Sequence, residues 1–583
     1  MSRVFNLDVS ALIATAELAA SEGKTPEEII SLYNDWLSAN GNNADAHPIW
    51  FNFGTLLSGQ GMKGQAIECY KKALGLNPSF WQAAANTAHV LEADGKVAEA
   101  IQVYEAFLDT PTTLEGRLHM RNQLGRLYEG QRNFPRASEL YYQSLCLKPD
   151  QDGAFQHWFS LKQKQCDWPL ETFVQSPTVR KLAEFIGPIG AMAYFDDPEL
   201  LHHACSSWIE RFSKGKNYYP MSSGGYGHKK LRVGYVSCDF RAHACCFLYA
   251  QMFAAHDREK FEVYGFDFSK EEQSVWRQMC LGGMDQTIAI HQMTDEEAAK
   301  LIRSMEIDIL VDLVGLTSGA RPGIFRYKPA PIQVSYLGFL GPTGIPEIDY
   351  IVCDDYVVPP HLAQHYGAKP LYVPFYQVNN QLRAPSEKPT RASQGLPEDA
   401  FVFCAINNSY KLNPAVFARW MRILDRSPNS VLWLLEENPS VKGNILREAK
   451  KYDVAPERLI FAKHVTPNDY LARFQCADLF LDTSPYNAGI TASDAIWVGL
   501  PVLTCPGNTF VSRMAADLMI KLGLDDLVCK DWEEYIRKAV ECAKTGKAKD
   551  LVAARLDRKS FVFDTQFFVR ALERKYFEVG QSI

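Results

Sequence analysis

The sequence predicts an α-solenoid of helical repeats followed by two α/β lobes. Three observations predict this: residues repeat every 34 positions in the N-terminal third, short apolar runs alternate with amphipathic stretches from Leu231 onward, and a second series of such runs begins after residue 398. At 583 residues the chain is also too long for one core. About three to four domains of ~150 residues are expected.

The repeats occupy residues 1–150. Four pairs of like residues lie 34 positions apart: Gly61 and Gly95, Ala66 and Ala100, Tyr70 and Tyr104, Leu74 and Leu108. This period is typical of tetratricopeptide helix pairs. After three extra residues in a turn, a third copy follows with Ala137, Tyr141 and Leu145. Small residues, Gly61 among them, are expected to let paired helices approach closely, and Pro78 and Pro149 to end the second helices.

Two roles are open for the repeat arm. It is either a spacer or dimer surface, so that a homodimer is one expectation, or a concave groove that holds a protein acceptor. Residues 151–228 are expected to continue as a helical linker region, and the glycine- and serine-rich stretch GKNYYPMSSGGYGHKK marks its end.

The first α/β lobe is expected over residues 229–385. Its predicted strands are LRVGYVS, FEVYGFDF, IDILVDLVG, PIQVSYLGF and DYIVCDDYV. Apolar strands separated by helices indicate a parallel sheet.

The second lobe is expected over residues 395–583, with a closing C-terminal helix. Its predicted strands are FVFCAIN, SVLWLLEE, RLIFAKHV, DLFLDTSP and PVLTCPG. Two Rossmann-like lobes leave a cleft between the carboxyl ends of their strands, where such folds bind nucleotides.

A candidate diphosphate site follows the fourth strand of the second lobe. That strand ends at Asp482, a loop rich in Pro, Asn and Gly follows, and a helix is expected to begin near Thr491. Free N–H groups and the positive end of the helix dipole would face the loop. Asp494 lies one turn into the helix, where it could accept hydrogen bonds from ribose hydroxyls. The alternative is that Thr491 is a helix cap and Asp494 a favourable first-turn acid.

Two further candidates follow the first strand of each lobe. Lys411 comes after FVFCAINN and could neutralise a leaving diphosphate. His243 comes after the first strand of the first lobe and could orient the reactants or take a proton. The alternatives are a solvated surface lysine and a loop histidine with satisfied hydrogen bonds.

Composition excludes several classes of protein. A net charge of −7 gives no sign of the excess positive charge that proteins use to bind nucleic acid. The apolar run IDILVDLVGL is too short for a membrane span. The fourteen cysteines include no CxxC pair, so neither a zinc cluster nor a disulfide framework is indicated. Because the N-terminal residues also lack a signal-peptide pattern, a cytoplasmic protein is expected.

Taken together, these motifs resemble the protein O-linked N-acetylglucosamine transferases of glycosyltransferase family forty-one. The resemblance covers nearly the whole chain and runs in order through these motifs: LRVGYVSCDFRAH, GARPGIFRYKPAPIQVSYLGFLGPTGIPEIDYIVCD, INNSYKLNP, ADLFLDTSPYNAGITASDAIWVGLPVLTCPG and SRMAA. It implies a GT-B fold of two Rossmann-like lobes behind tetratricopeptide repeats.

The resemblance also implies roles for single residues. His243 matches the family's active-site histidine and Lys411 the lysine that holds the donor diphosphate. Donor contacts are implied for Asn408, Tyr410, Gly489, Ile490, Thr491 and Asp494, with Asp494 matching the ribose-binding aspartate. The chain has Gly489 and Ile490 where the family's phosphate turn often has histidine and threonine.

The implied reaction is an inverting transfer of a sugar, N-acetylglucosamine from UDP-GlcNAc, onto Ser or Thr of a protein. Lys411 and a helix N-terminus would supply the counter-charge, so metal independence is expected, with the UDP-sugar as substrate and no further cofactor. The altered turn at 489–490 motivates one alternative, a flagellin or adhesin glycosyltransferase that uses a hexose, a nonulosonic acid or an Asn acceptor. A non-catalytic repeat scaffold is the other alternative.

Overall fold

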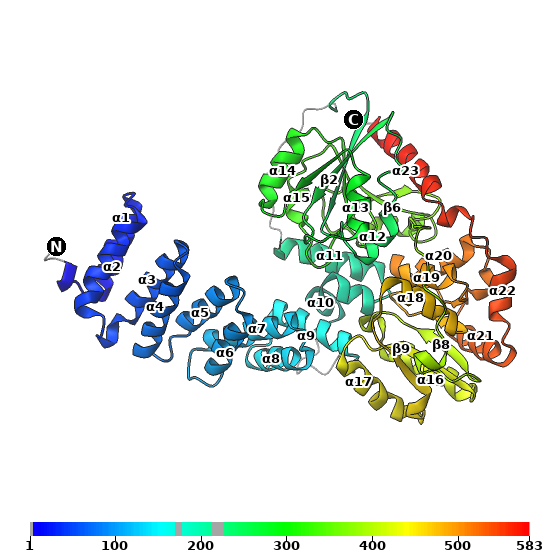
Figure 1. Ribbon diagram of the computed structural model, residues 1–583, viewed down its shortest axis with the longest axis horizontal. Coiled ribbons are helices and arrows are strands. Elements are labelled where there is room, and N and C mark those ends of the chain that lie inside the picture. The colour runs from blue at the N-terminus through cyan, green and yellow to red at the C-terminus, as the bar shows by residue number, and fades with distance from the viewer. Residues whose placement is uncertain (1–3, 170–177, 213–224, 582–583) are drawn as a thin grey trace. The chain divides into compact units, whose positions relative to one another are not determined.

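The chain folds into two compact units, Met1–Leu161 and Lys162–Ile583. A computed structural model describes residues 4–169, 178–212 and 225–581 (Figure 1). The first unit is helical, and the second holds two parallel sheets. The predicted fold class, helical repeats followed by two α/β lobes, is therefore confirmed.

The first unit consists of helices that pair in sequence order. Two leading helices, α1 (Val9–Ser21) and α2 (Pro26–Asn40), precede three pairs. The pairs are α3 (His47–Gly59) with α4 (Lys63–Leu76), α5 (Trp81–Ala93) with α6 (Val97–Phe107), and α7 (Leu114–Gly130) with α8 (Phe134–Leu147). These three pairs are the three copies that the repeat predicts.

The small residues of the repeat serve either helix packing or a left-handed turn. Ala66 and Ala100 are fully buried, as close helix packing requires. Gly61, by contrast, lies in the turn between α3 and α4 at φ +75°, with open space around it. Its predicted packing role is wrong, because the position needs left-handed backbone rather than a small side chain. The close contact is made by Gly54, where a Cβ would lie 2.7 Å from the Tyr70 ring.

Three helices lead from the repeats to the lobes: α9 (Asp152–Gln165), α10 (Val179–Tyr194) and α11 (Pro198–Phe212). Residues 213–224, most of the predicted glycine- and serine-rich linker, lie outside the described residues. The loop between α10 and α11 binds the second lobe, since the Asp196 carboxylate accepts hydrogen bonds from the backbone N–H groups of Asn508 and Thr509.

The first lobe is a seven-stranded parallel sheet in the order β3-β2-β1-β4-β5-β6-β7. Its strands are β1 (Leu231–Ser237), β2 (Phe261–Asp267), β3 (Gln286–Ala289), β4 (Ile309–Asp312), β5 (Ile332–Ser335), β6 (Tyr350–Cys353) and β7 (Lys369–Tyr372). Its helices are α12 (Ala244–Tyr249), α13 (Val275–Gly282), α14 (Asp295–Ser304) and α15 (Pro322–Arg326).

The sequence predicted five of these strands and missed β3 and β7. Both form the edges of the sheet, and every residue of β3 is exposed or partly exposed. Short edge strands face solvent on one side, so they carry no apolar run for a sequence pattern to detect.

The second lobe is a five-stranded parallel sheet in the order β10-β9-β8-β11-β12. Its strands are β8 (Phe401–Ala405), β9 (Ser430–Leu435), β10 (Leu459–Ala462), β11 (Leu479–Leu481) and β12 (Val502–Leu503). Its helices are α16 (Pro414–Arg426), α17 (Pro439–Ala449), α18 (Pro467–Arg473), α19 (Ile490–Trp497), α20 (Met514–Lys521), α21 (Trp532–Thr545) and α22 (Ala548–Arg555).

The final helix, α23 (Thr565–Gly580), returns to the first lobe and packs on its core (Figure 1). Phe568, Leu572 and Tyr576 join the apolar cluster around β1 and β4. Glu573 accepts hydrogen bonds from the backbone N–H of Asp257 and pairs with His256 at 3.1 Å. The C-terminal residues therefore tie the two lobes together.

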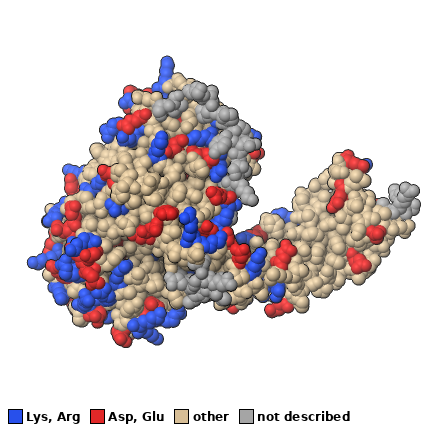
Figure 2. Space-filling view, turned by 180° about the vertical axis from the view of Figure 1, so that it is seen from behind, with Lys and Arg blue, Asp and Glu red and all other residues tan. Residues whose placement is uncertain are grey.

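The surface of the lobes is mixed in charge. Figure 2 shows Lys and Arg interspersed with Asp and Glu on one face. Within the described ranges, no helix has both the length and the apolar character needed to cross a bilayer.

The third repeat carries a strained residue where the first two carry glycine. Arg132 has φ +60° in the turn between α7 and α8, where Gly61 and Gly95 stand in the earlier repeats. A left-handed conformation costs an L-residue about 1–2 kcal/mol, and glycine avoids that cost. Arg132→Gly is therefore expected to stabilise the α7–α8 pair by about 1 kcal/mol.

Native-state hydrogen exchange would measure this effect locally, as amide exchange in α7 and α8 that is about fivefold slower. Gly95→Ala is the matched control and should accelerate exchange in α5 and α6. Unchanged or faster exchange in Arg132→Gly would contradict the assigned strain.

Candidate functional site

A cavity of about 450 Å³ lies between the two lobes. From the first lobe it is lined by Ala244, Cys245, Phe247, Leu248, Leu337, Gly338 and Leu340, with Gln377 and Arg383 from the segment after β7. From the second lobe it is lined by Ile406, Asn407, Asn408, Tyr410, Lys411, Leu435, His464, Val465, Pro467, Tyr470, Arg473, Tyr486, Gly489, Ile490, Thr491, Asp494 and Met514. All seven sequence-predicted donor-binding residues, Lys411 among them, line this one cavity.

Sheet topology explains why residues far apart in sequence meet here. Strands β8 and β11 are parallel neighbours, so the segments that follow them leave the same edge of the sheet. Asn407 and Asn408 follow β8, and the loop after Asp482 follows β11. The carboxyl edge of a parallel sheet is where open α/β folds bind ligands.

Lys411 is a buried ammonium that lines the cavity. Its side chain lies at the end of a 3₁₀ turn, Ser409–Lys411, and the residue is only 9% exposed. Its Nζ donates a hydrogen bond to the Asn487 carbonyl at 2.8 Å and lies 4.1 Å from the centre of the Tyr486 ring. An ammonium has three donors, so this arrangement leaves it able to bind an anionic ligand.

Burial sets the ionisation of this lysine. Desolvation lowers the pKa of Lys411 to about 8, and the nearby Asp482 opposes that shift. Desolvation also raises the pKa of Asp482 to about 7. A cation held so far out of water gains strongly from an incoming negative charge.

The loop after β11 is braced so that the first turn of α19 faces the cavity. Asp482 accepts hydrogen bonds from the backbone N–H of Ala488 at 2.7 Å and from the Thr504 hydroxyl at 2.7 Å. Gly489 is the N-cap of α19 and supplies no side-chain cap. Thr491 lies inside the helix, so the alternative that it caps the helix is wrong.

Asp494 is buried and ion-paired. The guanidinium of Arg383 binds its carboxylate with both terminal nitrogens, at 2.5 and 3.2 Å. Burial raises the pKa of Asp494, and Arg383 opposes that shift. Both residues line the cavity, so a ligand that reaches Asp494 also meets the guanidinium of Arg383.

His243 lies beside the cavity, while its neighbours Ala244 and Cys245 line it. It is the N-cap of α12, and its Nδ1 accepts a hydrogen bond from the backbone N–H of Cys245 at 3.4 Å. Nδ1 also lies 3.3 Å from the Asp239 carboxylate. Burial lowers the pKa of His243, and Asp239 opposes that shift.

The sequence did not single out several polar residues of the cavity, and Arg383, Asn407 and Arg473 are three of them. Arg383 follows the first lobe in a stretch with no recognisable pattern, and Asn407 and Arg473 are 2% exposed. The Asn407 Oδ1 and the Arg473 Nε have no hydrogen-bond partner within the described part of the chain. Buried polar atoms without partners suggest ligand contacts, but only the folded chain shows that they are buried.

The Arg383–Asp494 pair should stabilise the junction of the lobes as one unit. Removing either partner leaves a buried charge alone, so Arg383→Met and Asp494→Asn are each expected to lower the free energy of unfolding by about 3 kcal/mol. The double variant should lose much less free energy of unfolding than the two single variants lose together, and the difference, the coupling energy of the pair, should be about 2 kcal/mol. Urea denaturation followed by tryptophan fluorescence measures all three variants, and strictly additive losses would contradict the pairing.

Comparisons with known proteins find matches to both the repeats and the lobes of this chain. The Tetratricopeptide repeat family matches residues 51–112. An Arabidopsis thaliana protein, named as probable UDP-N-acetylglucosamine–peptide N-acetylglucosaminyltransferase SEC, is 34% identical over 462 residues, which cover 75% of this chain and 46% of the relative. The Caenorhabditis elegans UDP-N-acetylglucosamine–peptide N-acetylglucosaminyltransferase is 25% identical over 54% of this chain and 37% of its own. The chain thus spans less than half the length of these curated relatives.

A solved structure supports the fold over the whole chain. A mutant of the Thermobaculum terrenum O-GlcNAc transferase superposes with a TM-score of 0.62 at 24% identity, covering 98% of both chains. Glycosyl transferase family 41 matches residues 202–381 and 377–572, which include both lobes and every residue of the cavity. The chain belongs to glycosyl transferase family 41.

Proposed function

We propose that this protein is an inverting glycosyltransferase that moves N-acetylglucosamine from UDP-GlcNAc onto Ser or Thr of a protein. The observation that carries the proposal is the meeting of the Lys411 ammonium and the first turn of α19 in one cavity between the lobes. Family membership and the names of the Arabidopsis and Caenorhabditis relatives support the choice of donor and acceptor.

The cavity offers what a departing diphosphate needs. Negative charge builds on the diphosphate as the bond to the anomeric carbon breaks, and a preorganised cation lowers the energy of that transition state. Lys411 supplies the cation, and the uncapped N–H groups at Gly489, Ile490 and Thr491 supply donors. With this counter-charge provided by the chain, the reaction we propose needs no metal ion.

The remaining cavity residues are assigned to the donor and the acceptor. We assign Asn408 and Tyr410, which come just before Lys411 in the chain, to contacts with the donor, and Asp494 with Arg383 to contacts with the ribose; all four residues line the cavity. His243 stands on the opposite lobe beside the cavity, where it orients the acceptor hydroxyl or takes its proton. In either case, the hydroxyl attacks the anomeric carbon from the side opposite UDP, which inverts its configuration.

The repeat unit offers a separate surface for a protein acceptor. A groove of about 350 Å³ is lined by residues of α3, α5, α6 and α7. They include Trp81 and Asn86 of α5 and Tyr104 of α6. Aromatic residues are enriched at protein interfaces, and a side-chain amide can both donate hydrogen bonds to a peptide backbone and accept them from it. We assign the acceptor polypeptide to this groove.

The proposed function is tested first by removing the cation. Lys411→Met should abolish transfer from UDP-GlcNAc and weaken UDP binding, while circular dichroism and the melting profile stay unchanged or improve, because a buried charge is removed. Lys544, an exposed lysine of α21, provides the control, and Lys544→Met should retain full activity. Mass spectrometry of a protein acceptor with a panel of nucleotide sugars gives the readout. Substantial turnover by Lys411→Met would remove this lysine from the mechanism.

The lowered pKa of Lys411 predicts how UDP affinity depends on pH. A bound diphosphate favours the charged ammonium, so binding raises the pKa of Lys411 above the value of about 8 that it has in the protein without ligand. The extra affinity is fully present below pH 8 and is lost as pH rises above it, by up to about tenfold per unit. Calorimetry from pH 7.5 to 9.5 measures this loss, and the profile of Lys411→Met should be flat. A flat wild-type profile would contradict the assignment.

A further inference from the structure

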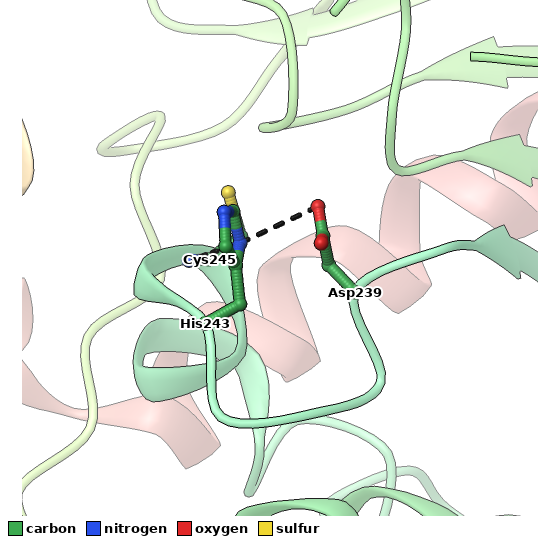
Figure 3. A group of neighbouring side chains, drawn as sticks. All are labelled: Asp239, His243 and Cys245. Carbon is green, nitrogen blue, oxygen red and sulfur yellow. Dashed lines mark hydrogen bonds and ion pairs between the residues drawn. The ribbon is translucent and has the colours of Figure 1, made fainter. Parts of the chain in front are cut away.

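Three side chains that commonly bind metals converge beside the cavity. Asp239 lies in the loop after β1, His243 caps α12, and Cys245 lies in the first turn of α12 (Figure 3). One ligand atom from each lies within 4.8 Å of the other two. The cysteine pattern of the sequence indicated no zinc cluster, because these three ligands do not follow a CxxC spacing.

The ligand atoms already lie next to one another. The Nδ1 of His243 accepts a long hydrogen bond of 3.4 Å from the Cys245 N–H, so it is assigned as the unprotonated ring nitrogen, and a metal would take over its lone pair by replacing that bond. Arg241 binds one oxygen of Asp239 at 3.1 Å, and the other oxygen faces the imidazole at 3.3 Å. The imidazole and the second carboxylate oxygen therefore already point toward each other, as Figure 3 shows.

The spacing is close to that of a tetrahedral site. Bonds of about 2.0–2.3 Å from zinc to nitrogen, oxygen and sulfur place the ligands of a tetrahedron roughly 3.3–3.8 Å apart. The His243–Asp239 distance of 3.3 Å already falls in this range. The three ligand atoms lie within 4.8 Å of one another, so small side-chain rotations would bring them to the distances of a zinc site.

We propose that Asp239, His243 and Cys245 bind Zn²⁺ at the edge of the cavity, and that this binding inhibits transfer. A sulfur, a nitrogen and an oxygen ligand favour zinc over Mg²⁺ or Ca²⁺, which prefer oxygen alone. As the Zn–S bond forms, the Cys245 thiol releases its proton to solvent. Three protein ligands leave one coordination position open to water.

Inhibition follows from the position of the site and rests on the proposed function. Cys245 lines the cavity, so a cation bound to it lies where the acceptor and donor would meet. Zinc also takes the Nδ1 lone pair of His243, the only in-plane lone pair of the neutral ring, so the imidazole can no longer take the proton of the acceptor. The site would therefore let the free zinc concentration control the enzyme.

Binding is tested with Co²⁺, a spectroscopic substitute for zinc, on the full-length protein after chelation and reduction. A near-ultraviolet band from thiolate-to-cobalt charge transfer and visible bands of a tetrahedral ion are expected. Cys245→Ser should abolish the charge-transfer band, and Asp239→Asn should weaken binding more than about tenfold. Cys146→Ser, which alters an exposed cysteine of the repeat unit, is the control and should keep the band. Failure of wild type to show the band, or its persistence in Cys245→Ser, would overturn the site.

Inhibition is tested separately by titrating Zn²⁺ into the transfer assay. Wild type should lose activity, and Cys245→Ser, compared with its own metal-free rate, should need more than about tenfold more Zn²⁺ for the same loss. Equal sensitivity of the two proteins would overturn the inhibitory role. A wild type that binds Co²⁺ but transfers no sugar without metal would refute the proposed function and leave the metal site standing.

Discussion

A buried ammonium is the physical constraint on which the site depends. Lys411 is almost entirely withdrawn from water, and the carbonyl of Asn487 is the hydrogen-bond partner that the described structure gives it. Removing a charge from water costs several kcal/mol, and neighbouring dipoles offset only part of that cost. We therefore propose that this position binds a ligand that brings negative charge. In that proposal, the β11 loop held by Asp482 and the uncapped start of α19 contact the same ligand.

The two lobes together form the cavity that we assign to this ligand. Each sheet is parallel, so all of its strands present their carboxyl ends to one edge, and both edges contribute to the cavity. The lobes are joined again by α23 and by the Arg383–Asp494 pair. The pair is formed by an arginine that follows the first sheet and an acid of the second, so it couples the junction of the lobes to the donor side of the cavity.

His243 stands where two kinds of chemistry overlap. As the N-cap of a short helix it is held with one nitrogen directed toward Asp239 and Cys245. The geometry that would fix the imidazole for the proposed reaction is the same geometry that would present it to the proposed cation. A single residue that orients an acceptor in the metal-free protein and binds zinc in its presence would link activity to metal supply without a separate regulatory domain.

Much of the site could be predicted from sequence because it depends on local order along the chain. The 34-residue period fixed the repeats, and the alternation of apolar runs fixed the buried strands, since both patterns reflect burial of side chains within one element. The positions of Lys411 and Thr491 after strands of one parallel sheet then predicted that they would meet.

The tertiary structure alone decided which side chains are paired and which are exposed. Arg383 binds Asp494 from 111 residues away, and no local pattern encodes such a partner. The strands β3 and β7 could not be predicted, because they lie at solvent-facing edges of the sheet. The sequence also predicted a packing role for Gly61, whereas the structure places it in a turn with left-handed backbone. The order of residues along the chain determines which helices and strands can form. Contacts, burial and charge pairing depend on distances between distant segments, and only the folded chain defines those distances.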